Sequence, residues 1–198
     1  WGTTTSNNIF FRDVLMHEHG HGIGLAHVCP VLGGVNGRLM EPIINTAIDG
    51  PRHDDIRGGQ FNYGDDKENN DAPGTASALG ALSNGVPVTL GTIPAPAVAN
   101  SSTLCLDAGV DLDYYSFSVA FSSTVNITVT PLGFTYDASV QSLACSANPN
   151  NCCTGNIVDS LAAADINFQV LASDGSTLVV NGSGAAAGSP ETVTNAPL

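Results

Sequence analysis

Three histidines near the start of the chain are spaced so that one helix and one turn can bring their rings together. Within residues 9–24 (IFFRDVLMHEHGHGIG), apolar residues and histidines recur at the spacing of one face of an α-helix. His17 and His21 lie four residues apart on that face. Their Cβ atoms are then expected about 5–6 Å apart. Gly24 suits the left-handed residue at which a helix ends, and a reversal there can bring His27 to the same place.

This spacing predicts a catalytic zinc site. Imidazole nitrogens bind Zn²⁺ at about 2.0–2.1 Å, and three of them leave a fourth position open, as in catalytic but not structural zinc sites. We therefore expect His17, His21 and His27 as the ligands. Glu18 projects about 100° around the helix from His17, where it can act as a general base without occupying a coordination position. The plainer interpretation of these residues is a polar, solvated helix.

Three motifs in order resemble a known family of zinc proteases. Residues 17–27 (HEHGHGIGLAH) match the metzincin signature at every specified position. Residues 38–42 (RLMEP) resemble the Met-turn of that clan, and residues 54–64, with an acidic start and a Tyr-Gly end, resemble the last helix of matrixins, the matrix metalloproteinase-like family. The resemblance covers about residues 8–64. It implies a truncated metzincin catalytic subdomain, consisting of the active-site helix, the Met-turn and the C-terminal helix, with Met40 supporting the zinc site from beneath.

The resemblance also implies an activity. A metzincin is a zinc-dependent metalloendopeptidase, in which a metal-activated water attacks the peptide bond and a glutamate, here Glu18, accepts the water proton and passes it to the leaving amine. Residues 42–45 follow the Met-turn, where matrixins build the wall of the main specificity pocket, and Ile43 or Ile44 would make that wall apolar. The expected substrate is a protein or peptide.

The chain also departs from the matrixin pattern. Val28 stands where matrixins commonly have Ser, and the pair Gly58-Gly59 weakens the last helix by roughly 1 kcal/mol per glycine. Sixteen residues precede His17, whereas a matrixin catalytic domain has an N-terminal sheet there, including the edge strand that holds the substrate. We therefore expect weak or no peptidase activity from residues 1–198 alone.

Other chemically suggestive residues have plainer expectations. His19 faces away from the ligand stripe and is predicted to be a surface histidine, and His53 is predicted to lie exposed in a loop. Met40 could be an ordinary core residue, although its Met-x-Pro setting favours the Met-turn. Asp54 and Asp55 are expected to serve helix N-terminal electrostatics and local bonding, and not catalysis.

Composition divides the chain into two regions. A length of 198 residues fits one large domain or two small ones. Residues 1–64 hold all five histidines and four of the five basic residues, whereas the remaining 134 residues hold twelve acids and one lysine. We expect a partial protease domain at 1–64, a linker with one short helical turn at 65–85, and a β-domain at 86–198, giving an α+β fold class overall.

The second region has the pattern of an antiparallel β-sandwich. Short runs rich in Val, Thr, Tyr and Phe alternate with turn residues, which predicts strands at 86–90, 114–120, 124–130, 167–172 and 177–180. Residues 111–119 (DLDYYSFSV) resemble the bacterial prepeptidase C-terminal β-sandwich, which follows secreted proteases. Asp107, Asp111 and Asp113 are either Ca²⁺ ligands or solvated loop acids.

Cysteine usage and charge indicate location and partners. Four cysteines (Cys105, Cys145, Cys152 and Cys153) lie in the β-region, where they could form two disulfides with three pairings open, and Cys29 is left over; reduced thiols are the other reading. We favour a secreted, extracellular protein. A formal net charge of −13 leaves no basic stripe for nucleic acid. No apolar run approaches the ~18 residues of a membrane helix.

A second function belongs to a different class. The chain could be a non-catalytic secreted module with a remnant zinc site, in which the β-sandwich contacts a surface or a polysaccharide. Stoichiometric zinc that is lost on His21→Ala favours the protease, whereas absence of zinc together with binding to an insoluble polymer favours the module. A non-peptidase enzyme with three histidine ligands would leave the Met-turn and the Asp-Asp helix unexplained.

Overall fold

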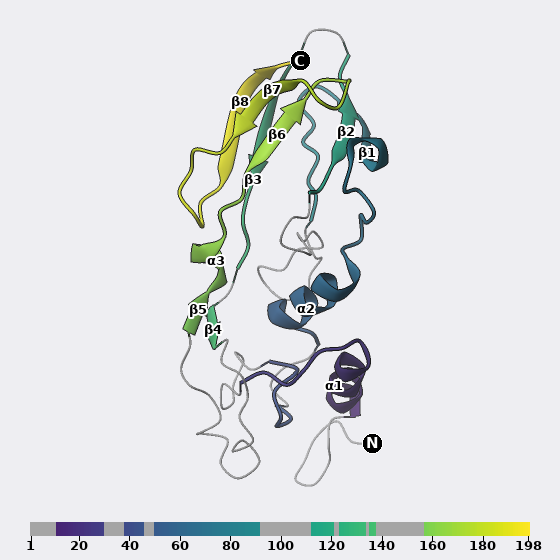
Figure 1. The fold of residues 1–198 in the computed structure, drawn as a ribbon, viewed down its shortest axis with the longest axis vertical. Coiled ribbons are helices and arrows are strands. Elements are labelled where there is room, and N and C mark those ends of the chain that lie inside the picture. Colours follow the sequence, from purple (N-terminus) through teal and green to yellow (C-terminus); the bar gives the residue numbers. More distant parts are fainter. Residues whose placement is uncertain are drawn as a thin grey trace. The chain divides into compact units, whose positions relative to one another are not determined.

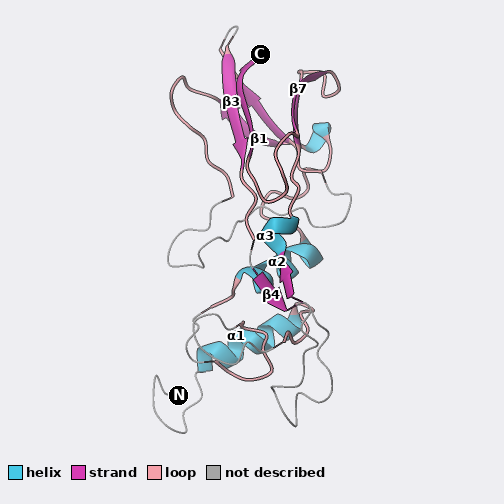
Figure 2. Cartoon of the chain, turned by 90° about the vertical axis from the view of Figure 1, so that its left-hand side faces the viewer, coloured by secondary structure: helices cyan, strands magenta, loops and turns pink. Residues whose placement is uncertain are grey.

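The computed structural model describes residues 11–29, 38–45, 50–91, 112–120, 123–133, 135–137 and 157–198. These residues form three α-helices, one 3₁₀ helix and eight short strands, so the predicted mixed α+β class is confirmed (Figure 2). The chain divides into two compact units. Among the described residues, the first unit takes in those from 11 to 63 with 135–137 and 157–159, and the second takes in those from 64 to 133 with 160–198. No helix in the described part is long and apolar enough to cross a membrane.

The described residues of the first unit form two helices and one strand pair (Figure 1). Helix α1 spans Phe11–Gly22 and helix α2 spans His53–Tyr63. Strand β4 (Thr135–Asp137) pairs antiparallel with β5 (Ile157–Asp159). Both helices predicted in this half of the chain are therefore present. The strand pair was not predicted.

A small apolar core forms where residues 39–40 pack against α1 and the segment that follows it. Leu39 and Met40 are buried, at 8% and 1% exposure. Met16 from α1 and Leu25 and Val28 from the following segment pack against these two residues. Several other buried side chains of the first unit are polar or charged, namely Asp13, Arg38, Glu41, His53 and Asp55. Burying so many polar groups requires specific contacts for them.

The second unit is built mainly from strand pairs. Its elements are η1 (Pro73–Thr75), β1 (Ser77–Ala81), β2 (Tyr115–Ser118), β3 (Thr124–Val129), α3 (Ser160–Ala163), β6 (Phe168–Leu171), β7 (Leu178–Gly182) and β8 (Glu191–Pro197). Strand β1 pairs with β2, β3 with β8 and β6 with β7, and β7 also contacts β8. The predicted strands at 114–120, 124–130, 167–172 and 177–180 are confirmed, with ends that differ by a few residues.

Strand β3 shows why the alternating pattern predicted these strands correctly. Its side chains are exposed and half-buried in strict alternation, with Val125, Ile127 and Val129 on the half-buried face. The exposed face carries Thr128, whose hydroxyl oxygen lies 3.2 Å from that of Thr192 on β8. One face of the β3–β8 pair is therefore exposed to solvent, as expected for a strand in which apolar and polar residues alternate.

Several details of the second unit differ from the prediction. Residues 86–90 form no strand, because Pro87 lacks the N–H that a strand ladder needs. Residues 65–85, expected as a linker, contain the short helical turn η1 but also strand β1. The β1–β2 pair is parallel, whereas antiparallel pairing was expected. The strand pair β4–β5 comes from within 86–198 but belongs to the first unit.

Candidate metal centre

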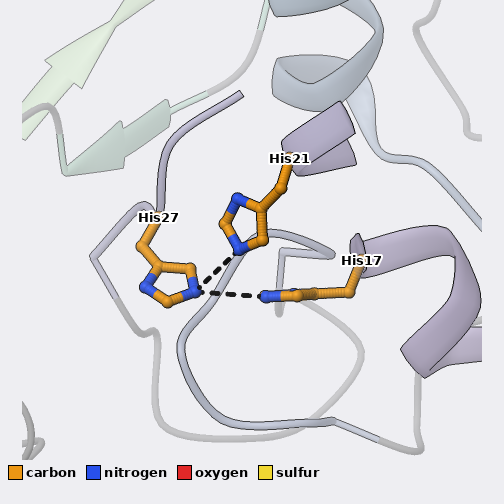
Figure 3. Close-up of side chains that lie close together, drawn as sticks. All are labelled: His17, His21 and His27. Atoms are coloured by element: carbon orange, nitrogen blue, oxygen red, sulfur yellow. Dashed lines mark hydrogen bonds between the residues drawn. The ribbon is translucent and has the colours of Figure 1, made fainter. Parts of the chain in front are cut away.

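The three predicted histidine ligands lie together (Figure 3). His17 and His21 come from α1, and His27 comes from the segment after the helix. The Nε2 atom of His27 lies 3.1 Å from Nε2 of His17 and 3.1 Å from Nε2 of His21. The ligand atoms of all three side chains lie within 4.8 Å of one another. Two of the rings are half-buried and the His21 ring is exposed, so the cluster is open to solvent on one side.

Backbone carbonyls orient two of the rings. His17 Nδ1 lies 2.8 Å from the carbonyl oxygen of Leu39, and His21 Nδ1 lies 2.9 Å from that of Leu25. A carbonyl oxygen only accepts, so each Nδ1 carries the proton and donates it. The Nε2 atoms of His17 and His21 then present their lone pairs to the centre of the cluster, in the arrangement that metal-binding imidazoles have.

The chain reversal that brings His27 to the site is a Schellman motif. Gly24 has a φ of 89°, which confirms the left-handed residue predicted at the helix end. Its N–H donates to the carbonyl of His21 at 3.0 Å, and the N–H of Leu25 donates to that of Gly20 at 2.9 Å. Asn62 of α2 donates its side-chain N–H to the carbonyl of Ile23 at 3.2 Å, which holds the turn from the other side.

One of the two glycines of α2, Gly58, allows this close packing. A Cβ atom at Gly58 would lie 2.7 Å from Leu25 Cδ2, and one at Gly59 would lie 3.7 Å from Ile23 Cδ1. Gly58, which lowers the helix propensity of α2, therefore lets the helix approach the turn before His27, whereas a side chain at Gly59 would make an ordinary contact.

Met40 packs against helix α1. It is 1% exposed, and a Cβ atom at Gly20 of α1 would collide with its sulfur. Its carbonyl accepts the N–H of Val28 at 2.9 Å. The burial of Met40 agrees with both interpretations of this residue, the Met-turn and an ordinary core position. Residues 38–42, the predicted Met-turn, also supply the Leu39 carbonyl that orients His17.

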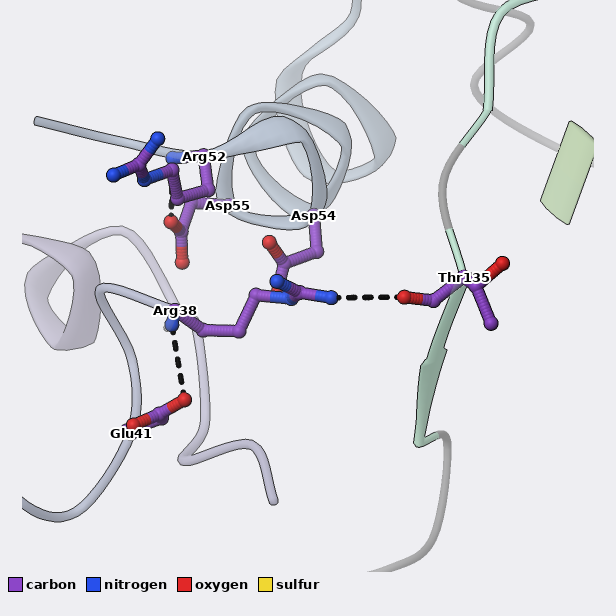
Figure 4. A network of polar contacts seen from close by, with 6 residues as sticks. All are labelled: Arg38, Glu41, Arg52, Asp54, Asp55 and Thr135. Carbon is purple, nitrogen blue, oxygen red and sulfur yellow. Dashed lines mark hydrogen bonds and ion pairs between the residues drawn. The ribbon is translucent and has the colours of Figure 1, made fainter. Parts of the chain in front are cut away.

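Arg38 holds the Met-turn in place (Figure 4). Its guanidinium donates to the carbonyl of Thr135 at 3.1 Å, and its Nε lies 3.3 Å from Asp54 Oδ2. Its backbone N–H donates to Glu41 Oε1 at 3.0 Å. Arg38 therefore joins the Met-turn to α2 and to β4. Sequence spacing gave no signal for this role, because Thr135 lies far away along the chain.

At the acidic start of α2, Asp55 is buried and Asp54 is half-buried beside the predicted Met-turn. Asp55 Oδ2 accepts the backbone N–H of Arg52 at 2.7 Å. The pKa of Asp54 is raised to about 6, by burial first and by the neighbouring Asp55 second, while Arg38 opposes the shift. Burial also raises the pKa of Asp55, against hydrogen bonds from the backbone of Arg52 and of the Met-turn.

Two expectations about single residues are wrong. His53 is 6% exposed and begins α2, whereas an exposed loop was predicted, and its burial, followed by Arg57 and then Arg38, lowers its pKa. Cys29 is buried at 3% exposure and forms a disulfide, whereas it was expected to be left over. Both corrections reflect packing that joins parts of the chain distant in sequence.

The remaining predicted site residues are placed as follows. Glu18 lies exposed on α1, one residue after His17, and His19 is exposed as predicted. Ile43 and Ile44 follow the Met-turn and are 49% and 43% exposed. Asp113 is half-buried. Asp107 and Asp111, and the cysteines other than Cys29, lie outside the described residues.

Comparisons of this chain with family models, with curated proteins and with solved structures found no match. The functional conclusion therefore depends on the geometry of the site and on the sequence motifs.

Proposed function

We propose that the chain belongs to a zinc-dependent metalloendopeptidase of the metzincin clan, with matrixin-like features. The observation that carries the proposal is the convergence of His27 Nε2 on Nε2 of His17 and His21, at 3.1 Å from each. Two nitrogens bound to a tetrahedral zinc at about 2.0–2.1 Å lie about 3.3–3.4 Å apart. Two of the three nitrogen pairs are therefore close to the spacing that a zinc ion requires, and all three ligand atoms lie within 4.8 Å of one another.

The chemistry follows from the residues around the ion. His17, His21 and His27 would hold Zn²⁺, which when bound polarises a carbonyl oxygen and makes water more acidic. The carboxylate of Glu18, exposed next to the first ligand, accepts a proton from the attacking water and returns it to the leaving nitrogen. The exposed Ile43 and Ile44 provide apolar surface for a substrate side chain.

We also propose that the protein is secreted. The support is the disulfide at Cys29, since structural disulfides persist in oxidising compartments. In this proposal, the strand pairs of the second unit belong to a prepeptidase C-terminal-like β-sandwich. Asp113 is the described member of its candidate calcium ligands. Calorimetric titration with Ca²⁺ tests that ligand role, and absence of heat would remove it.

Metal analysis tests the protease proposal. Protein purified without chelator should contain one zinc per chain, and His21→Ala should lose it. Glu18→Ala should keep the zinc but lose peptide cleavage wherever the intact protein cleaves. Absence of zinc in the wild-type chain, with binding to an insoluble polysaccharide, would instead favour a non-catalytic secreted module.

A further inference from the structure

The two ligands on α1 are oriented by carbonyls from different parts of the chain. His21 Nδ1 donates to the Leu25 carbonyl at 2.9 Å, four residues further along. His17 Nδ1 donates to the Leu39 carbonyl at 2.8 Å, 22 residues away. The acceptor for His21 therefore belongs to the end of α1, whereas the acceptor for His17 depends on how residues 38–42 are held.

Arg38 connects residues 38–42 to two other elements of the first unit (Figure 4). Its guanidinium group donates to the Thr135 carbonyl on β4 at 3.1 Å, and its Nε lies 3.3 Å from Asp54 Oδ2 on α2. The Arg38 side chain is 5% exposed and the Asp54 side chain 16%. Solvent and salt screen such a pair less than they screen a surface ion pair.

The backbone beside Arg38 links these contacts to His17. The Leu39 peptide follows Arg38 directly, and its carbonyl accepts the Nδ1 proton of His17. Asp55 of α2 accepts hydrogen bonds from the backbone of Leu39 and Met40. The carbonyl that orients His17 is thus held by Asp55 on one side and by the Arg38 side chain on the other.

We propose that Arg38 is a positioning residue for the zinc site, which fixes the Leu39 carbonyl and through it the ring of His17. The inference rests on the proposed zinc site. With Arg38 in place, the carbonyl keeps the proton of His17 on Nδ1, so that the Nε2 lone pair is directed at the ion. Without the guanidinium group, the Leu39 carbonyl loses the support of Asp54 and Thr135, and the ring is held less firmly.

The sign of the expected effect separates positioning from charge. Arg38 is a cation, and removal of a positive charge would by itself strengthen the binding of Zn²⁺. Loss of a group that orients a metal ligand instead weakens metal binding, typically by about 10–100-fold. Because Asp55 still holds the backbone of Leu39, we expect the lower end of this range, a fall of about 10-fold in Arg38→Met.

The first experiment measures the zinc affinity of the full chain at pH 8 by competition with a chromophoric chelator. Arg38→Met should bind zinc more weakly than the wild type. The matched control is Arg57→Met, which removes the same charge from the first unit. Arg57 lies on α2 and donates to Gln60 Oε1 on the same helix at 3.1 Å, so its removal should not weaken zinc binding.

A second measurement does not need the ion. In zinc-free protein, nitrogen-15 NMR of the imidazole rings shows which ring nitrogen carries the proton. His17 and His21 of the wild type should both be protonated at Nδ1. In Arg38→Met, the His17 signals should shift toward the tautomer mixture of a free imidazole, and the His21 signals should stay unchanged. A general loss of stability would instead move the signals of both rings.

A second variant covers a failure to fold. Arg38→Met leaves the Asp54 carboxylate without this ion-pair partner, and breaking a buried pair in this way is strongly destabilising. Where circular dichroism shows that Arg38→Met does not fold, the double variant Arg38→Met with Asp54→Asn replaces it, because the amide is neutral. Failure of both variants to fold would overturn the proposal, since Arg38 would then sustain the whole unit.

The outcomes separate the two proposals. Failure of the wild type to bind zinc overturns the zinc site itself. Unchanged or stronger zinc binding in a folded Arg38 variant overturns only the positioning role. An equal change in the NMR signals of His17 and His21 would also overturn it, because the effect would then not pass through the Leu39 carbonyl.

Discussion

The two units bury different numbers of charged or polar side chains: among the described residues of the second unit, only Asn70 and Glu191 are of this kind. Among the described residues of the first unit, five charged or polar side chains are buried beside three apolar ones. The second unit instead pairs strands, with one face of β3 half-buried along its length. A buried polar side chain is stable only when it has a hydrogen-bond or ion-pair partner. Strand pairing instead depends on many similar contacts repeated along the two strands. The first unit should therefore be sensitive to single contacts and to metal, and the second should not.

The largest expected effect is in the small apolar core of the first unit. Met40→Ala should lower the free energy of unfolding by about 2–5 kcal/mol, because it opens a cavity under Gly20 of α1. Leu15→Ala, at an exposed position on the same helix, should cost less than about 0.5 kcal/mol. Urea unfolding of both variants measures the difference. Equal costs would show that the Leu39–Met40 cluster is not a core.

The half-buried carboxyl of Asp54 should make the free energy of unfolding depend on pH. Its folded pKa is raised to about 6, so the folded state binds the proton more tightly than the unfolded state does. This contribution is present below pH 4 and is lost as pH rises to about 6, with a total of roughly 3 kcal/mol.

Asp54→Asn should remove that component of the pH dependence. Urea unfolding of metal-free wild type and variant at pH 4, 5, 6 and 7 measures it. Parallel curves for the two proteins would contradict the raised pKa.

A smaller effect is expected at the helix end. Gly24→Ala places a side chain in the left-handed region and should cost about 1–2 kcal/mol, with weaker zinc binding because the turn carries His27. The matched control is Gly22→Ala, whose Cβ meets no atom within 4 Å. Zinc titration of both variants tests the turn, and an unchanged affinity in Gly24→Ala would count against it.

The smallest effect is expected in the second unit. Thr128→Ala removes one partner of the exposed cross-strand pair with Thr192 and should cost about 0.2–1 kcal/mol. Zinc affinity should be unchanged, because both residues belong to the other unit. A change in the zinc affinity of Thr128→Ala would contradict the expectation that single contacts in the second unit do not affect metal binding.

The parts predicted from sequence are those fixed by local spacing. The positions of His17, His21 and Gly24 follow from helical period and from the conformational freedom of glycine, and the structure has them as expected. The alternating residues of β3 also predicted their strand. Strand β1 was missed because its sequence, SALGA, lacks the β-branched and aromatic residues that mark strands.

The parts that were missed depend on contacts distant in sequence. The burial of His53, the contact of Arg38 with Thr135 and the disulfide of Cys29 join segments that no local pattern links. The hydrogen bond of His17 to the Leu39 carbonyl is of the same kind. Contacts of this kind produce no periodic pattern in the sequence, so residue spacing does not predict them.

Zinc K-edge X-ray absorption of the metal-loaded chain tests the central claim most directly. The account predicts one zinc coordinated by three imidazole nitrogens at about 2.0–2.1 Å, with the fourth position taken by solvent. A zinc held by sulfur or by four protein ligands, or a chain that binds no zinc, would contradict it.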